Sequence, residues 1–213
     1  MLRIAVLVSG GGTNLQAIID NIKSGFLEFV KICVVVAGRS DAYALQRAKE
    51  NGIDAFVLIR KDFKDQDSYD EAMIGILGER DTDLVVTAGF MTVMGDKFIN
   101  RYRHRAINVH PALVPSFCGK GYYGIIPHRK ALEYGVKVSG ATVHFVDPEV
   151  DAGPVILQKA IDIEGIEDEG ELQRKIMEEC EWKILPEAIR LISEGRVEIR
   201  GRKVYINRKD EGR

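Results

Sequence analysis

Short runs of apolar residues alternate along the chain with stretches in which apolar residues recur every three or four positions. Uninterrupted apolar runs of this length are typical of parallel strands buried on both faces, and the three-to-four spacing is typical of amphipathic helices. The pattern predicts helices at 15–22, 43–50, 69–80, 128–134 and 172–193, with Ser68 capping the third. It predicts strands at 3–9, 30–36, 55–59, 84–87, 106–109, 141–146 and 155–159.

This alternation predicts the fold class. Strands that alternate with helices form a doubly wound α/β fold, in which a single, mostly parallel, Rossmann-like sheet is flanked by helices. No repeat or linker divides residues 1–213, so we expect one domain. Its phosphate-binding half spans about 1–100 and its second half about 101–206. A hairpin at 197–206 and a polar, disordered tail at 207–213 are expected to close the chain.

Composition removes several functional classes. A net charge of −2 with scattered Lys and Arg gives no electrostatic case for nucleic acid. The three cysteines lack metal-type spacing, and their odd number argues against a disulfide framework. The apolar run at 4–8 is too short for a signal peptide or a membrane span. We therefore expect a cytoplasmic protein that binds neither metal nor membrane.

A glycine-rich loop, residues 10–14, joins the first strand to the first helix. Backbone N–H groups and the positive end of a helix make such a loop suitable for phosphate. Gly10 and Gly12 fit a dinucleotide fingerprint, but Leu15 occupies its third glycine position, and the next strand ends without a carboxylate for a ribose. The loop therefore indicates a smaller phosphate ligand. A glycine turn without any ligand is the alternative.

The chemistry-bearing stretch is the strand end at 106–110. Asn108 and His110 are two residues apart, so in an extended chain they point to the same side, and Pro111 keeps His110 extended. An amide donor beside an imidazole suits acyl or formyl transfer, in which a carbonyl oxygen gains charge. Asp151, in a loop with two other carboxylates, would raise the pKa of His110 if it lay beside it. For Asn108 and His110, the alternative is a buried polar pair satisfied by its neighbours. For Asp151, the alternative is a surface turn.

Two further segments border the expected site. Phe90, Met91 and Met94 follow the fourth strand and could line an apolar pocket for a flat ring, or simply pack in the core. Residues 116–127 are rich in glycine and lack a hydrophobic period, which predicts a flexible loop. Tyr122 and Tyr123 in that loop could close over a ligand or pack the loop down.

These motifs resemble the phosphoribosylglycinamide formyltransferase family over residues 4–206. The matching segments are 9–18, 88–91, 108–115 and 144–154. The resemblance implies that Asn108, His110 and Asp151 are catalytic. It implies that the ribonucleotide substrate is held by Gly12, Thr13, Asn14, Glu178, Glu179, Cys180 and Glu181. It implies that folate is held by Gln66, Phe90, Met91, Thr92, Val93, Met94, Asn108, Asp147, Pro148, Glu149, Val150 and Asp151.

The chain also departs from the family pattern. Thr92 stands where some members carry Arg, and Gln66 stands where an Arg that reaches the folate often occurs. Arg60, Lys61 or Lys64 could compensate. Trp182 replaces a more usual His, and the loop at 118–126 is longer than in several members. None of these departures touches the catalytic set.

The resemblance implies direct transfer of the formyl group of 10-formyltetrahydrofolate to the amine of phosphoribosylglycinamide in purine synthesis. No metal is implied, the partners are these small molecules, and the protein is a monomer or homodimer. One alternative is a formyltetrahydrofolate deformylase, although that family carries an additional N-terminal regulatory domain. Another is a non-catalytic nucleotide-binding module. A tRNA formyltransferase is disfavoured because no basic surface is present.

Overall fold

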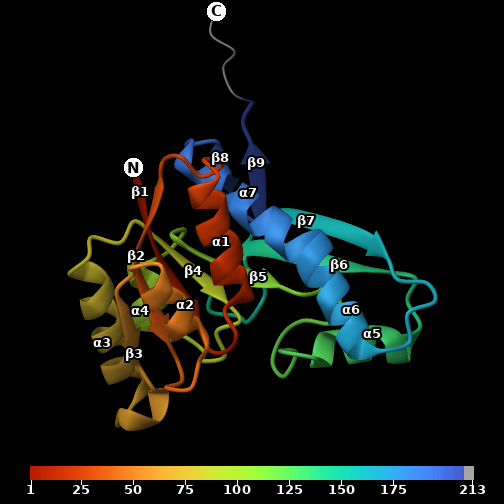
Figure 1. The fold of residues 1–213 in the computed structure, drawn as a ribbon, viewed down its shortest axis with the longest axis horizontal. Coiled ribbons are helices and arrows are strands. Elements are labelled where there is room, and N and C mark those ends of the chain that lie inside the picture. The colour runs from red at the N-terminus through yellow and green to blue at the C-terminus, as the bar shows by residue number, and fades with distance from the viewer. Residues whose placement is uncertain (209–213) are drawn as a thin grey trace, which may run out of the picture.

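The structure is a computed structural model, and it describes residues 1–208. Its centre is a seven-stranded sheet with the order β3-β2-β1-β4-β5-β6-β7 (Figure 1). Neighbouring strands from β3 to β5 are parallel, whereas β6 is antiparallel to both β5 and β7. The strands are β1 (Leu2–Val8), β2 (Val30–Ala37), β3 (Ala55–Val57), β4 (Leu84–Ala88), β5 (Ala106–His110), β6 (Val138–Phe145) and β7 (Val155–Asp162). The predicted doubly wound, mostly parallel α/β fold is confirmed.

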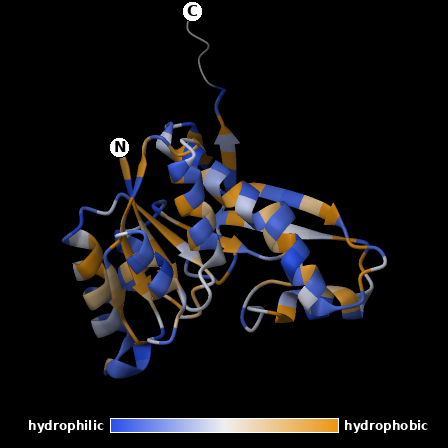
Figure 2. Cartoon of the chain, viewed as in Figure 1, coloured by the Kyte–Doolittle hydropathy of each residue, from blue (hydrophilic) through white to orange (hydrophobic). Residues whose placement is uncertain are grey.

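Helices cover both faces of this sheet. One face packs against α1 (Thr13–Lys23), α2 (Ala44–Glu50), α5 (Ile126–Tyr134), α6 (Glu169–Ile176) and α7 (Trp182–Ser193). The other packs against α3 (Gln66–Gly78) and α4 (Asp96–Arg101), which follow a short 3-10 turn, η1 (Arg60–Asp62). Strand β1 shows why its apolar run is continuous, since Ile4, Val6 and Val8 enter the first core and Ala5 and Leu7 the second. Figure 2 shows that the helices carry both colours, as expected where one side of a helix packs on the sheet and the other faces solvent.

The helix predicted at 172–193 is interrupted, so that prediction was wrong in detail. Helix α6 ends at Ile176, a π-helical turn η2 (Met177–Glu181) follows, and α7 begins at Trp182. A π turn accommodates one additional residue in a helix, and such turns are frequent at functional sites. Here it lies directly beside the glycine loop, because Asn14 contacts Glu181.

The start of α3 is also corrected. Asp65, rather than Ser68, is the N-cap, and its carboxylate accepts from the Ser68 amide at 2.8 Å. The Asp65 amide donates in return to the Ser68 hydroxyl at 3.4 Å, which completes a capping box. Helix α5 begins two residues earlier than predicted, at Ile126.

The carboxyl-terminal part contains the expected hairpin, formed by β8 (Val197–Arg200) and β9 (Lys203–Ile206). Of the predicted disordered tail at 207–213, residues 209–213 lie outside the described residues; the Asn207 amide donates to the Arg196 carbonyl at 2.9 Å. Within residues 1–208, no helix has both the length and the apolar character that crossing a bilayer requires.

The sheet topology places the candidate residues together. The chain leaves β1 towards β2 and β3, then returns to the opposite side of β1 as β4. In such sheets, ligands bind at the carboxyl ends of the strands where this reversal occurs. The glycine loop follows β1, Gly89 follows β4, and His110 ends β5. The Ser9 hydroxyl accepts a hydrogen bond from the Met91 amide at 3.0 Å, which joins the first two of these segments.

Candidate active site

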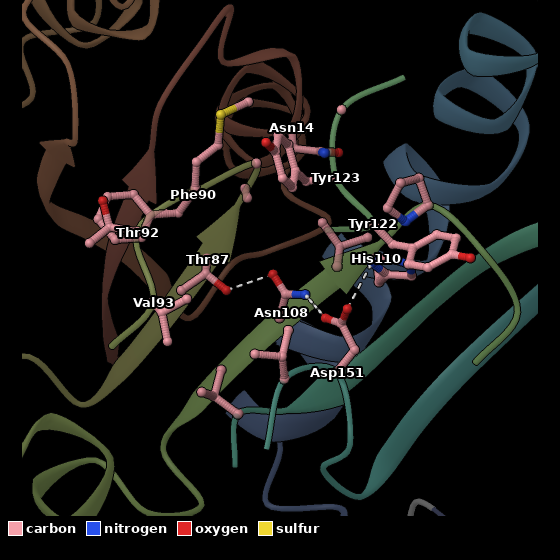
Figure 3. A pocket seen from close by; sticks show the side chains of 18 of the residues that line it. Asn14, Thr87, Phe90, Thr92, Val93, Asn108, His110, Tyr122, Tyr123 and Asp151 are labelled. Atoms are coloured by element: carbon pink, nitrogen blue, oxygen red, sulfur yellow. Dashed lines mark hydrogen bonds and ion pairs between the residues drawn. The ribbon is translucent and has the colours of Figure 1, made fainter. Parts of the chain in front are cut away.

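A cleft of about 500 Å³ lies beyond these strand ends. Segments far apart in the sequence line it, and Figure 3 shows their side chains converging on one space. The lining includes the glycine loop at 10–14, residues 87–94, residues 108–111, the loop at 119–124, residues 146–148, Val150, Asp151, and Gln173, Met177 and Glu181 of the α6–η2 segment.

Asp151 is the centre of the polar group in this cleft. Its Oδ2 lies 3.5 Å from His110 Nδ1 and accepts from the Gly119 amide at 2.9 Å. Its Oδ1 lies 3.6 Å from His144 Nε2 and 3.5 Å from Asn108 Nδ2. Burial opposes ionisation of Asp151, but these contacts outweigh burial and hold its pKa below the usual value. The predicted grouping of Asn108, His110 and Asp151 is therefore present, with an ionised carboxylate at its centre (Figure 3).

Neighbouring strands fix the orientation of the Asn108 amide. Thr87, paired with Asn108 across the β4–β5 ladder, donates its hydroxyl to Asn108 Oδ1 at 2.7 Å. This bond places Nδ2 on the cleft side, where it lies 3.2 Å from His144 Nε2. His144 Nδ1 in turn lies 2.8 Å from the Phe145 carbonyl oxygen, which favours the tautomer with Nδ1 protonated. Asn108 is thus held as a donor towards the cleft.

The structure corrects the expectation for His110. Its ring is 4% exposed, and burial lowers its pKa below 6.5, even though Asp151 and the Phe117 carbonyl both act to raise it. His110 Nε2 lies 2.9 Å from that carbonyl, and Nδ1 faces Asp151, so both ring nitrogens face acceptors. The resting imidazole is therefore mainly neutral at neutral pH. Its surroundings nevertheless suit a second proton once further negative charge develops nearby.

The glycine loop is shaped by a close contact with α2. Gly12 has φ +69°, and a Cβ there would lie 2.7 Å from the Ala44 Cβ, so both the backbone and the space require glycine. Gly12 is the N-cap of α1, and no side chain among residues 1–208 caps that helix end. The free amides at this end therefore face the cleft, which supports the predicted phosphate-binding role.

Asn14 joins the glycine loop to η2. Its Nδ2 donates to Glu181 Oε2 at 2.6 Å, and both side chains are buried. Burial raises the pKa of Glu181 to about 7, while the bond from Asn14 acts in the opposite direction. Thr13 similarly contacts the sulfur of Met177 at 3.7 Å. The loop and the π turn therefore form one wall of the cleft.

The structure does not bring every predicted binding residue into the cleft. Glu178 and Glu179 do not line it, and Cys180 lies in the hydrophobic core, so of this group only Glu181 faces the cleft. In the folate set, Glu149 and Gln66 are also outside the lining. Gln66 lies behind residues 90–94, where it donates to the Val93 carbonyl at 3.3 Å and accepts from Arg60 at 2.8 Å.

Sequence reasoning missed two side chains that organise the site. Thr87 and His144 reach Asn108 only through strand pairing, which aligns Thr87, Asn108 and His144 across β4, β5 and β6. The available signal was their position near the ends of predicted strands. The sequence pattern does not show which strands are neighbours in the sheet, so the contacts of Thr87 and His144 with Asn108 could not be inferred from it.

Replacing Thr87 by valine is expected to lower kcat roughly five-fold with little change in substrate binding. Valine preserves the shape but removes the hydroxyl that orients the Asn108 amide, a bond worth about 1 kcal/mol. Steady-state kinetics with both substrates measure this effect. Thr82→Val is the matched control, because Thr82 is also buried but lies outside the cleft. Equal activity of the Thr87 variant and the control would contradict an orienting role.

The raised pKa of Glu181 predicts a pH-dependent loss of stability. Between pH 4.5 and 7 the folded protein holds a proton on Glu181 that the unfolded chain has released, so this contribution is present below pH 4.5 and is lost as pH rises through 7. Glu181→Gln removes the titration. We expect the free energy of unfolding of the variant, minus that of the wild type, to increase by roughly 2 to 3 kcal/mol between pH 5 and 8.5.

Denaturant unfolding across this pH range measures the difference. The other titrating groups are common to both proteins, including His110 and His128, whose lowered pKa values destabilise the fold as pH falls. If the free energies of unfolding of the wild type and the variant changed in parallel with pH, Glu181 would be ionised in the folded protein over this range.

Comparison with known proteins accords with this geometry. Residues 2–189 match the formyl transferase family. The phosphoribosylglycinamide formyltransferase of Haemophilus influenzae is 37% identical over 98% of this chain and 95% of its own length. The crystal structure of glycinamide ribonucleotide transformylase 1 from Symbiobacterium toebii superposes with a TM-score of 0.91 at 42% identity, covering 98% of this chain and 95% of that one.

A formyltetrahydrofolate deformylase from Pseudomonas syringae shares the fold, with a TM-score of 0.86, but is only 24% identical and is covered over 66% of its length. The full-length matches above 30% identity are therefore the ones that assign the family. The chain belongs to the phosphoribosylglycinamide formyltransferases, within the formyl transferase family.

Proposed function

We propose that this protein transfers the formyl group of 10-formyltetrahydrofolate to the amine of phosphoribosylglycinamide, a step of purine synthesis. The observation that carries the proposal is that the Asn108–His110–Asp151 group shares one cleft with two further sets of residues, each of which forms a wall of that cleft. One wall is the glycine loop with η2, and the other is the apolar segment 90–94 with residues 146–151. Two substrates bound at these two walls would both lie in the cleft that contains the polar group.

The reaction begins with attack of the neutral substrate amine on the formyl carbon. The new C–N bond gives a tetrahedral intermediate with negative charge on the former carbonyl oxygen. The intermediate then expels the folate N10, and the proton lost by the attacking nitrogen passes to N10. The products are the formylated ribonucleotide and tetrahydrofolate, so neither an oxidant nor a covalent enzyme intermediate is required.

Asn108 and His110 stabilise the oxyanion in this mechanism. The amide is held as a donor by Thr87. The imidazole takes its second proton from solvent, keeps its two N–H groups on Asp151 and the Phe117 carbonyl, and places a positive charge beside the oxyanion. Because the oxyanion is negative, its formation raises the pKa of His110 back from the value that burial imposes. Asp151 stabilises the resulting imidazolium and holds the water that carries the proton from the amine to N10.

The ribonucleotide occupies the wall formed by residues 12–14 and Glu181. Free amides at the start of α1 take the phosphate, and Glu181 contacts the glycinamide end. Glu178 and Glu179 do not line the cleft, and Cys180 packs in the hydrophobic core. The pterin occupies the other wall, formed by Phe90, Met91, Thr92, Val93 and Met94 with Asp147, Pro148 and Val150. Gln66 holds the 90–94 segment through the Val93 carbonyl, and Glu149 lies outside the lining.

A phosphate-binding loop distinguishes this proposal from its rivals. A deformylase uses water as the acceptor and has no need of the Gly12–Asn14 wall. A nucleotide-binding module would use that wall but would not need a buried carboxylate that contacts Asn108 and two imidazoles. We further propose that the protein works in the cytoplasm as a monomer or homodimer, with these small molecules and no metal or nucleic acid.

A spectrophotometric assay with 10-formyltetrahydrofolate, with and without phosphoribosylglycinamide, tests the proposal. Folate turnover that requires the ribonucleotide is expected. Equal turnover without it would identify a hydrolase. Binding of both ligands without turnover would leave a binding module and contradict the proposed reaction.

A further inference from the structure

His128 is a buried histidine that the mechanism above does not use. It lies in the first turn of α5, its side chain is 1% exposed, and it forms part of the cleft wall. Neither of its ring nitrogens has a hydrogen-bond partner in the part of the chain that the structure describes. A buried polar atom without a partner costs about 1 to 3 kcal/mol, so a group from outside the chain, such as a ligand or an ordered water, normally completes it.

The surroundings of His128 determine what such a ligand must offer. Burial, followed by the nearby His110, lowers the pKa of His128 to about 4, and Glu169 acts in the opposite direction. The ring is therefore neutral at physiological pH and presents one N–H donor and one acceptor nitrogen. A neutral group that can both donate and accept, such as a hydroxyl or a carboxamide, satisfies this pair better than a phosphate does.

The position of α5 places His128 on the ribonucleotide side of the cleft. Arg129, the next residue, forms two hydrogen bonds of 2.6 and 2.7 Å with the Glu169 carboxylate, which fixes the start of α5 to the start of α6. From there, Gln173, Met177 and Glu181 follow at intervals of four residues, and all three line the cleft. Met177 and Glu181 contact the glycine loop. The predicted folate segment at 90–94 instead contacts Ser9, through the Met91 amide, and Gln66 of α3, through the Val93 carbonyl.

We propose that His128 is a binding residue for the acceptor substrate, and that it hydrogen-bonds an uncharged hydroxyl or carboxamide group between the phosphate and the reacting amine. This inference rests on the proposed acceptor, phosphoribosylglycinamide. It adds a residue of α5 to a wall otherwise made by the glycine loop and η2. It also gives the buried imidazole the partner that residues 1–208 do not supply.

Calorimetric titration of His128→Leu with phosphoribosylglycinamide is the first test. Leucine fills the space without a polar atom, so we expect ribonucleotide affinity to fall roughly ten-fold and folate affinity to stay unchanged. His128→Gln, which retains a donor and an acceptor, should recover part of the loss. Lys130→Gln, on the exposed part of the same helix, is the matched control. Unchanged ribonucleotide affinity in a folded Leu variant, or equal losses for both ligands, would overturn the proposal.

Ribose 5-phosphate separates the two possible contacts. If the Leu variant also loses affinity for this probe, His128 contacts a ribose hydroxyl. If only the complete ribonucleotide is affected, it contacts the glycinamide carboxamide. Both results support the proposal.

A measurement on the unmodified protein covers the case in which the Leu variant does not fold. In protein labelled with ¹⁵N-histidine, whose four histidines can be assigned with single variants, the His128 nitrogen signals should shift on addition of ribonucleotide but not of folate. No shift with the ribonucleotide would overturn the proposal. The dependence of turnover on ribonucleotide is assayed separately, so failure of the proposed reaction would remain distinguishable from failure of this contact.

Discussion

Replacing Asp151 by asparagine is expected to lower kcat roughly 10²-fold or more while both substrates still bind. Asp151 contacts His110, Asn108 and His144 and is the only ionised group that joins them in the described structure. Asparagine preserves the size and part of the hydrogen bonding, but it removes the charge that stabilises an imidazolium at His110. Steady-state kinetics, with ligand affinities measured separately, test the effect.

The backbone at this position makes the substitution informative. Asp151 has φ +56°, and asparagine tolerates the left-handed region as readily as aspartate does, so the loop should keep its conformation. Asp81→Asn is the matched control, because Asp81 also has a positive φ, of 47°, and an ion pair, with Arg3 at 3.1 Å, but lies outside the cleft. Similar kcat values for the two variants would contradict the role assigned to Asp151.

The same substitution should also change the pH dependence. Asp151 acts to raise the pKa of His110 against burial, so its removal lowers that pKa further. Because the mechanism needs the protonated ring when the oxyanion forms, the residual activity of the variant should decline at a lower pH than that of the wild type. A decline at the same pH would show that a different group limits the rate there.

Replacing His110 by alanine has the second largest expected effect, also roughly 10²-fold or more in kcat. The imidazole is the group in the cleft that can take a proton beside the oxyanion, and alanine leaves Asp151 without that partner. His110→Gln should recover only a small part of the loss, since an amide can donate a hydrogen bond but cannot become positively charged.

Loss of the contact between His110 and the Phe117 carbonyl could loosen the neighbouring loop, so ligand affinities are measured together with kcat. Retained affinities would assign the defect to the chemical step. His104→Asn is a suitable control, because His104 is exposed, lies outside the cleft, and has a positive φ that asparagine tolerates. Near-normal turnover of His110→Ala would remove the histidine from the mechanism.

Much of the fold could be predicted from the sequence because its strands are buried on both faces. The continuous apolar run of β1 is an example, since its successive side chains enter two different cores. The side shared by Asn108 and His110 followed from strand geometry alone, and both residues indeed line the cleft. The local sequence pattern was sufficient for features that depend on a single strand or helix.

Features that depend on two or more elements could not be predicted in this way. Residues 172–193 have continuous helical character, and the π turn within them coincides with tertiary contacts, including burial of Cys180 and the bond between Asn14 and Glu181. The lowered pKa of His110 depends on burial, which reverses the effect expected from Asp151 alone. Thr87 and His144 entered the site only through strand order and register.

The central claim is direct transfer of the formyl group at the Asn108–His110–Asp151 centre. It is tested most directly by following the formyl carbon of ¹³C-labelled 10-formyltetrahydrofolate by NMR in the presence of phosphoribosylglycinamide. We predict that the label appears in the formamide of the ribonucleotide in a one-to-one ratio with tetrahydrofolate formed, without free formate, and that this transfer is about 10²-fold slower in Asp151→Asn. Release of the label as formate, or equally fast transfer in the variant, would contradict the account.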